Sequence, residues 1–287
     1  MKSAPRLRQV HKRSAALAAA FLAGLWFLAA RPAPLLVLTY HRVTDAASGP
    51  VPAVRPADFA RQLDYLRRAG YRSIGPEELH AHMTGTGRLP PRAVLITFDD
   101  GWADNYTEAL PLLRARGFVA TVFVVSGLVG RRDRLSAGQL RELAAEGWTI
   151  GAHTRHHRHL PGLSPAATRL EIHGSRQDLG RLLGRPVTAF AYPYGDFDPA
   201  VRAEVAAAGF TTAFGTRLGF PRPGQDPLTI KRLTMPRRGG AVLLGLVGSA
   251  WYGPVRLVLE GVAATWPAVK VQEAYARRLW RRPPTRP

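Results

Sequence analysis

The stretch LITFDDGW, residues 95–102, joins a strand pattern to an unusual pair of charges. Its β-branched and aromatic residues are typical of a buried strand, which then ends in two adjacent carboxylates, Asp99 and Asp100. Carboxylates that lie this close repel each other, and one of them should resist ionising. Taken alone, the pair is typical of a solvated Asp-Gly turn at a strand end, so its function has to be judged from the rest of the chain.

Strand patterns and helix patterns alternate along the chain on both sides of this stretch. Strands are expected at residues 35–40, 71–74, 93–98, 120–125, 149–153, 188–193, 211–216 and 228–233. Apolar residues at helical spacing, each time ending near a glycine, occur at residues 57–70, 103–117, 136–147, 164–184 and 198–209. Short connections between alternating strands and helices predict parallel strands. With seven or eight such units, we expect an α/β fold, an irregular (β/α) barrel rather than an open sheet.

The composition limits the classes of function. The chain has 287 residues, a hydrophobic fraction of 46%, no cysteine and a formal net charge of +20. The apolar fraction is sufficient for a large core, and the absence of cysteine excludes a disulfide framework and thiolate metal ligands. The charge suggests an anionic neighbour such as nucleic acid, a membrane surface or an acidic polymer.

The N-terminal region favours the membrane among these neighbours. Five Lys or Arg residues in the first fourteen positions precede an uncharged, largely apolar segment at residues 15–30. This order is typical of an export signal, either cleaved or retained as an anchor, and we favour retention because no clean cleavage site stands out. The basic flank should stay in the cytoplasm, which places the rest outside it, in the periplasm or on the cell surface. No nucleic-acid motif is recognised, so nucleic acid is not an expected partner.

These patterns divide the chain into three predicted regions. Residues 1–34 are expected to form the cytoplasmic basic stretch and the membrane anchor or signal segment, and residues 35–240 the main α/β domain. Residues 241–287 are apolar and Gly-rich at first and basic at the end. They are interpreted either as an amphipathic surface segment with a basic tail or as a helix packed on the barrel and followed by a solvated tail. The oligomeric state is not predicted.

A histidine-rich segment, GAHTRHHRHL at residues 151–160, follows one of the expected strands. His153 and His157 are four residues apart, which lets both imidazoles meet one ion, and a carboxylate from elsewhere would complete a catalytic zinc set with an open position for water. Asp100 and His153 both follow strands, and strand ends converge on one face of a parallel barrel. The alternative is a solvated loop that is rich in histidine by chance.

A third segment, FAYPYGDF at residues 190–197, predicts a rigid aromatic turn at another strand end. Proline restricts the backbone of this turn, and glycine permits close approach. Alone, it is typical of an ordinary Pro-Gly turn.

Three segments therefore occur in order: TFDDG, HTRHH and AYPYG. Together they resemble the polysaccharide deacetylase family, carbohydrate esterase family 4, over roughly residues 35–235. The resemblance implies that Asp99 is the catalytic base and that the metal ligands are Asp100, His153 and His157. The implied cofactor is one divalent ion, with zinc in first place and nickel, cobalt or iron as alternatives.

The same resemblance implies roles for the aromatic turn. Its residues would wall the substrate groove, and the backbone N–H of Tyr194 would face the developing oxyanion. The expected substrate-binding residues are Tyr192, Pro193, Gly195 and Trp102.

Two features depart from the common pattern of the family. No histidine follows His173, although the usual acid is a histidine near the C-terminal end of the domain. His41, just after an early strand, resembles the acid of the rearranged branch that includes the poly-β-1,6-N-acetylglucosamine deacetylases; the alternative is a polar residue that caps a strand. The arginine that commonly precedes the turn is also missing, since Ala191 stands near its place, and Arg232 is a candidate replacement.

The sequence thus predicts a membrane-anchored, metal-dependent hydrolase that removes acetyl groups from N-acetylglucosamine units of an extracytoplasmic polysaccharide. Two alternatives remain open at this point. One is a deacetylase or amidase that acts on peptidoglycan, xylan or a small amide, because fold alone does not select the substrate. The other is a catalytically silent glycan-binding protein of the cell envelope.

Overall fold

The computed structural model describes residues 35–46 and 51–247. Its main sheet contains β1 (Leu36–Tyr40), β4 (Arg72–Ser73), β5 (Ala93–Phe98), β6 (Thr121–Val124), β7 (Thr149–Ala152), β8 (Ala189–Ala191), β9 (Thr212–Phe214) and β10 (Leu233–Thr234). The α-helices are α2 (Pro56–Arg68), α3 (Pro76–Met83), α4 (Leu110–Arg114), α5 (Ala137–Ala145), α6 (Pro165–Leu183), α7 (Pro199–Ala207) and α8 (Gly240–Val247). Three short helical turns complete the description: the π-helix η1 (Asn105–Ala109) and the 3₁₀ turns η2 (Ser126–Leu128) and η3 (Pro193–Gly195).

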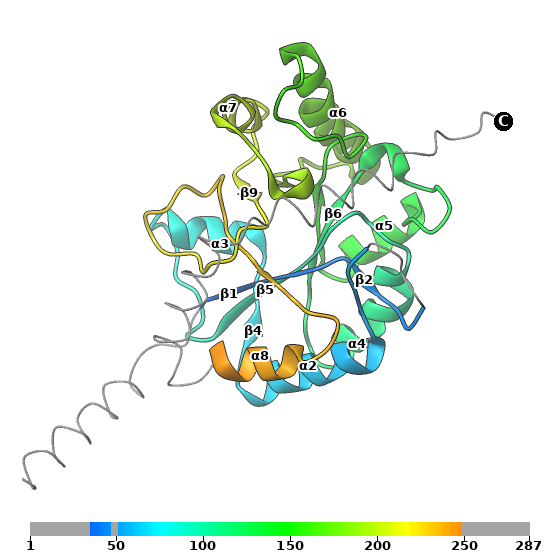
Figure 1. Cartoon of the computed structure of the whole chain (residues 1–287), viewed down its shortest axis with the longest axis vertical. Coiled ribbons are helices and arrows are strands. Elements are labelled where there is room, and N and C mark those ends of the chain that lie inside the picture. Colours follow the sequence, from blue (N-terminus) through cyan, green and yellow to red (C-terminus); the bar gives the residue numbers. More distant parts are fainter. Residues whose placement is uncertain (1–34, 47–50, 248–287) are drawn as a thin grey trace, which may run out of the picture.

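The strands of the main sheet are parallel and follow the order β10-β1-β5-β6-β7-β8-β9, with β4 beside the first part of β5. After β9 the chain pairs with Phe214 through Ile230, and then with β1 through β10. One segment therefore joins both ends of the sheet, which curls as a (β/α) barrel requires. Figure 1 shows the helices around the outside of the central strands. The predicted α/β class with parallel strands is confirmed.

The alternation of side chains along each strand determines which of them point into the barrel. Successive side chains of a strand point to opposite faces, so Leu95, Thr97 and Asp99 share the inner face of β5 and its end. Leu95 belongs to an inner apolar cluster with Phe123 and Phe214, while the outer faces pack under the helices. The last residues of β1, β5 and β7 belong to the outer cluster, so the same period places the residue that follows each of them on the interior face; these are His41, Asp99 and His153.

Two expected elements differ from the structure. Of residues 228–233, only Leu233 lies in a strand, because the segment crosses from β9 to β1 and pairs with each only briefly. Residues 103–117 form a π-helix followed by α4 instead of one helix. Pro111 has no N–H to donate to the carbonyl of Thr107, which favours the wider turn at this point. A small pair of parallel strands, β2 (Arg42–Val43) and β3 (Ala53–Val54), was not expected.

The predicted flanking regions are only partly covered. Residues 1–34 lie outside the described residues, as do residues 248–287. The described start of the C-terminal region, α8, packs its buried Leu244 and Val247 beside α2 (Figure 1). None of the helices within residues 35–46 and 51–247 has the length and apolar character needed to cross a membrane.

Candidate active site

The loops that follow the strands contain the polar residues of the site. Among the described residues, five non-glycine residues have a positive φ, and all lie in these loops or in the loop packed against Trp102: Asp100, Asp133, Thr154, His157 and Tyr194. Each such conformation costs about 1–3 kcal/mol and persists only where its surroundings enforce it. This concentration of backbone strain marks the carboxyl ends of the strands as the functional face.

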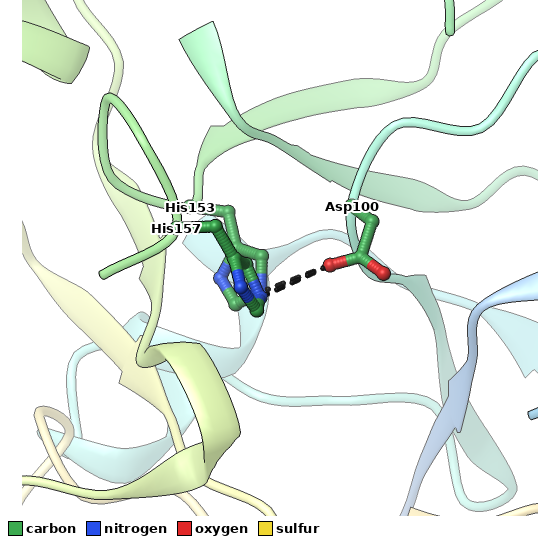
Figure 2. Close-up of side chains that lie close together, drawn as sticks. All are labelled: Asp100, His153 and His157. Carbon is green, nitrogen blue, oxygen red and sulfur yellow. Dashed lines mark ion pairs between the residues drawn. The ribbon is translucent and has the colours of Figure 1, made fainter. Parts of the chain in front are cut away.

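Asp100, His153 and His157 form a compact, buried cluster. The Nε2 atoms of His153 and His157 lie 3.5 Å and 3.2 Å from the same carboxylate oxygen, Oδ1 of Asp100. The three candidate ligand atoms lie within 4.8 Å of one another, and Figure 2 shows both imidazoles facing the carboxylate. Two histidines and one carboxylate form a known donor set for catalytic zinc, which leaves room for water or substrate.

The second ring nitrogen of each histidine is bonded to the protein. Nδ1 of His153 lies 2.7 Å from the carbonyl oxygen of Ala191. Because a carbonyl oxygen only accepts, this nitrogen carries the proton. Nδ1 of His157 lies 3.1 Å from the hydroxyl oxygen of Tyr194, whose own proton goes to the carbonyl oxygen of His157 at 3.3 Å. With Nδ1 bonded in this way, the Nε2 atom of each ring lies on the side of Asp100, where its lone pair would be available to an ion, so the donor set fits a divalent ion.

The loop between the two histidines is held by α6. Glu171, which is 1% exposed, accepts hydrogen bonds from the backbone N–H groups of Arg155 and His156 at 3.0 and 2.8 Å. Its other oxygen bonds Nδ1 of His156 at 2.9 Å. Inside the loop, the hydroxyl of Thr154 accepts the N–H of His157 at 2.9 Å. His156 is thus occupied in positioning the loop rather than in the ligand cluster.

Asp99 is paired with Arg232. The guanidinium donates to both carboxylate oxygens, at 2.8 and 2.7 Å, and to the hydroxyl of Thr97 at 3.1 Å. Both charged residues are buried, with Arg232 at 0% and Asp99 at 2% exposure. Burial alone would raise the pKa of Asp99, but the charge of Arg232, helped by His153, holds this pKa below its usual range. Arg232, the candidate replacement for the missing arginine, is therefore the residue that braces Asp99, and Asp99 is ionised near neutral pH.

His41 directly follows β1, the strand beside β5. A positive charge on His41 would lower the pKa of both Asp99 and Asp100. Its Nδ1 is buried and has no hydrogen-bond partner among the described residues. The side-chain amide of Asn105 donates to the carbonyl oxygen of His41 at 2.9 Å, which ties this segment to the start of η1.

Most residues of the aromatic turn are buried, and Tyr194 contacts one of the candidate ligands. Tyr194 adopts φ +61° and contacts His157, whereas Tyr192 is fully buried and donates its hydroxyl proton to the carbonyl of Leu228 at 3.0 Å. Pro193 and Gly195 are also buried. Gly195 has a positive φ, and a Cβ at this position would collide with Thr216, so the turn requires glycine. The contacts of these residues with substrate stay a prediction.

Trp102 was expected to contact substrate, and this contact stays a prediction; its indole N–H bonds Asp100, and the residue is 8% exposed. Two other residues near the cluster were not assigned from the sequence. Glu171 and Arg134 were not singled out, because a carboxylate within a helix pattern and an arginine in a loop are both typical of solvated surfaces. His159, outside the matched motif, pairs with Asp196 at 2.8 Å.

Comparison with known proteins gives a consistent set of relatives. The family model described as Polysaccharide deacetylase matches residues 86–213. The protein YxkH of Bacillus subtilis (strain 168) is 29% identical over 226 residues, which cover 79% of this chain and 77% of YxkH. Poly-beta-1,6-N-acetyl-D-glucosamine N-deacetylase of Staphylococcus aureus (strain MRSA252) is 25% identical over 226 residues, 69% of this chain and 77% of that protein. The solved structure of IcaB from Ammonifex degensii is 31% identical, with a TM-score of 0.68, and the match covers 76% of this chain and 98% of that chain.

Proposed function

Because this chain belongs to the polysaccharide deacetylase family, we propose that it is a metal-dependent hydrolase that removes acetyl groups from N-acetylglucosamine units of an extracytoplasmic polysaccharide. The observation that carries this proposal is that a candidate base and a candidate metal site lie next to each other and are both buried. An ionised carboxylate, Asp99, is held by Arg232 directly beside a donor set that fits one divalent ion. The name of the Staphylococcus aureus relative supports the choice of polymer.

The chemistry divides between the two carboxylates. Asp100 and the two histidines would hold a divalent ion, which would supply Lewis acidity to the acetyl carbonyl and to the attacking water. Asp99 accepts the proton that water loses as it attacks the carbonyl carbon. The backbone N–H of Tyr194 is proposed to stabilise the charge that develops on the carbonyl oxygen. The carbon–nitrogen bond then breaks, and the amine leaves with a proton donated by His41.

His41 is proposed as this acid because a histidine donates and recovers a proton around neutral pH. In the variant His41→Ala, we expect metal content and fold to be kept while amide hydrolysis falls about 10²–10⁴-fold, the range for loss of general acid catalysis. An activated ester such as p-nitrophenyl acetate, whose leaving group needs no proton, should be affected much less. The measurement compares both substrates in metal-loaded enzyme.

His80 offers a matched control for this experiment. It also has a buried Nδ1 without a partner among the described residues, but it lies on α3. His80→Ala should retain hydrolysis of both substrates. Near-normal amide hydrolysis by His41→Ala, or an equal loss on both substrates, would show that another group supplies the proton.

Metal removal tests the proposed function as a whole. Chelation should abolish acetate release from poly-β-1,6-N-acetylglucosamine, and an added divalent ion, zinc first, should restore it, because the ligands alone supply no Lewis acid. Acetate release should be measured in parallel on chitin oligomers, peptidoglycan and acetylated xylan. A preparation shown by elemental analysis to be metal-free should not turn over. Full activity in it, or glycan binding without acetate release from any polymer, would contradict the proposal.

We also propose that the domain acts outside the cytoplasm while residues 15–30 remain as a membrane anchor. The basic flank before this segment supports that orientation, and the net charge of +20 suits an anionic membrane surface. A reporter that is active only in the cytoplasm, fused after residue 40, should give no signal, whereas the same reporter fused after residue 14 should give a strong one. Strong activity after residue 40 would reverse the topology.

A further inference from the structure

Asp100 presents its two carboxylate oxygens to different partners. Oδ1 is the oxygen that faces Nε2 of both His153 and His157. Oδ2 accepts a hydrogen bond of 3.0 Å from the indole Nε1–H of Trp102. Since an indole N–H is only a donor, it has to be satisfied by an acceptor when it is buried, and here the ligand carboxylate is that acceptor.

The indole that makes this hydrogen bond is fixed in place. The guanidinium carbon of Arg134 lies 3.5 Å from the ring centroid of Trp102, and that of Arg42 lies 4.7 Å from it. Arg42 is itself held by Asp104 at 2.7 Å. Stacked guanidinium groups hold an aromatic ring by cation–π attraction as well as by packing.

Arg134 also holds the backbone of the ligand. Its Nη1 donates to the carbonyl oxygen of Asp100 at 2.8 Å. The backbone of Arg134 also forms an antiparallel β-bridge with that of Trp102. The flanking N–H of Leu135 bonds the carbonyl oxygen of Gly101 at 3.0 Å. These contacts enforce the φ of +76° that Asp100 adopts. Both the main chain and one carboxylate oxygen of Asp100 are therefore immobilised before any ion binds.

We propose that Trp102 is a positioning residue for the metal site, which holds Oδ2 of Asp100 so that Oδ1 alone is presented to the ion. A carboxylate held in this way contributes one ligand atom rather than two, which keeps positions free for water and for the substrate carbonyl. It also enters the site already oriented, so less freedom is lost when the ion binds. The proposal rests on the metal site of the proposed function and adds to it a role for the indole N–H.

The variant Trp102→Phe tests this role because it keeps an aromatic ring for the arginines and removes only the donor and part of the ring. The readout is the dissociation constant for zinc, measured by competition with a chromogenic chelator on full-length protein. Loss of a hydrogen-bond partner behind a ligand typically weakens metal binding about 10–100-fold, and we expect a loss in this range.

Trp148→Phe is the matched control. Trp148 is a buried tryptophan in the core, stacked on Phe98 at 5.6 Å, and the change removes the same atoms away from the ligands. Its zinc affinity should stay within about twofold of the unchanged protein. Equal losses in both variants, or no loss in Trp102→Phe, would overturn the proposal. If the unchanged protein binds no zinc at all, it is the proposed metal-dependent function that fails.

A second measurement covers the case in which circular dichroism shows that Trp102→Phe does not fold. The unchanged protein, labelled with ¹⁵N at its indole groups, is titrated with zinc while the indole signals are followed. An indole N–H bonded to a ligand carboxylate is protected from exchange with solvent and shifts when the ion binds. The proposal requires one such signal, and it is contradicted if no protected indole signal moves.

Discussion

Asp99→Asn is expected to lower acetate release about 10²–10⁴-fold, the range for loss of a general base, while the protein keeps its metal. The amide cannot accept the proton that water must lose, but the ligand atoms of Asp100, His153 and His157 are untouched. Asp100→Asn should instead weaken metal binding, because an amide oxygen is a poorer ligand for zinc than a carboxylate oxygen. The measurements are the rate of acetate release and the metal content by elemental analysis, made on the same preparations.

These two variants are matched, since each exchanges one oxygen of an adjacent aspartate for an amide nitrogen. Asp99→Asn also leaves Arg232 buried beside a neutral group, so the comparison needs a temperature at which circular dichroism shows both proteins folded. Equal metal loss in both variants would refute the division between base and ligand. A full rate in Asp99→Asn would remove this residue from the mechanism.

Arg232→Met should produce the largest loss of stability. Removing one partner of a buried ion pair leaves the other charge uncompensated, which typically costs about 3–5 kcal/mol. In this variant only burial and weaker charges act on Asp99, so its pKa should rise and the base should be protonated over more of the pH range. Acetate release at neutral pH should fall, and the acid limb of the pH–rate profile should move to higher pH.

The pH dependence of stability has a definite sign in this variant. In Arg232→Met, a raised pKa means that folded Asp99 holds its proton at pH values where the unfolded carboxyl has lost it. Stability therefore falls as pH rises from the unfolded pKa of about 3.9 through the raised folded pKa. The free energy of unfolding, measured in denaturant, should be closer to that of the unchanged protein at about pH 5 than at pH 7.

Two controls separate the effect of breaking this buried ion pair from the effect of replacing any arginine by methionine. Arg202 and Asp226 form an ion pair of the same length, 2.7 Å, but their side chains are 39% and 33% exposed, so Arg202→Met should cost no more than about 1 kcal/mol. The double variant Asp99→Asn/Arg232→Met should be more stable than the sum of the single losses predicts, because the uncompensated charge is gone. If Arg232→Met matches the unchanged protein in both stability and rate, Arg232 does not support the base.

Most of the metal cluster could be predicted from the sequence. The strand at residues 93–98 was expected with its observed bounds. Because side chains alternate between the two faces of a strand, Asp99 shares the face of Leu95 and Thr97. His153 and Asp100 follow parallel strands, whose ends meet on one face of a barrel. Such features depend on residues close together in the chain, and a single sequence records them directly.

The partners of these residues were decided by the tertiary structure. Arg232 lies 133 positions from Asp99 in the sequence. The pattern of its segment predicts an ordinary strand, but the segment crosses from β9 to β1. Only closure of the sheet places its guanidinium inside the barrel. The same holds for the contact of Glu171 with the histidine loop and for the hydrogen bond from the indole of Trp102 to Asp100. Local patterns determine which face a side chain occupies, whereas the group that it meets there depends on how packing brings distant segments together.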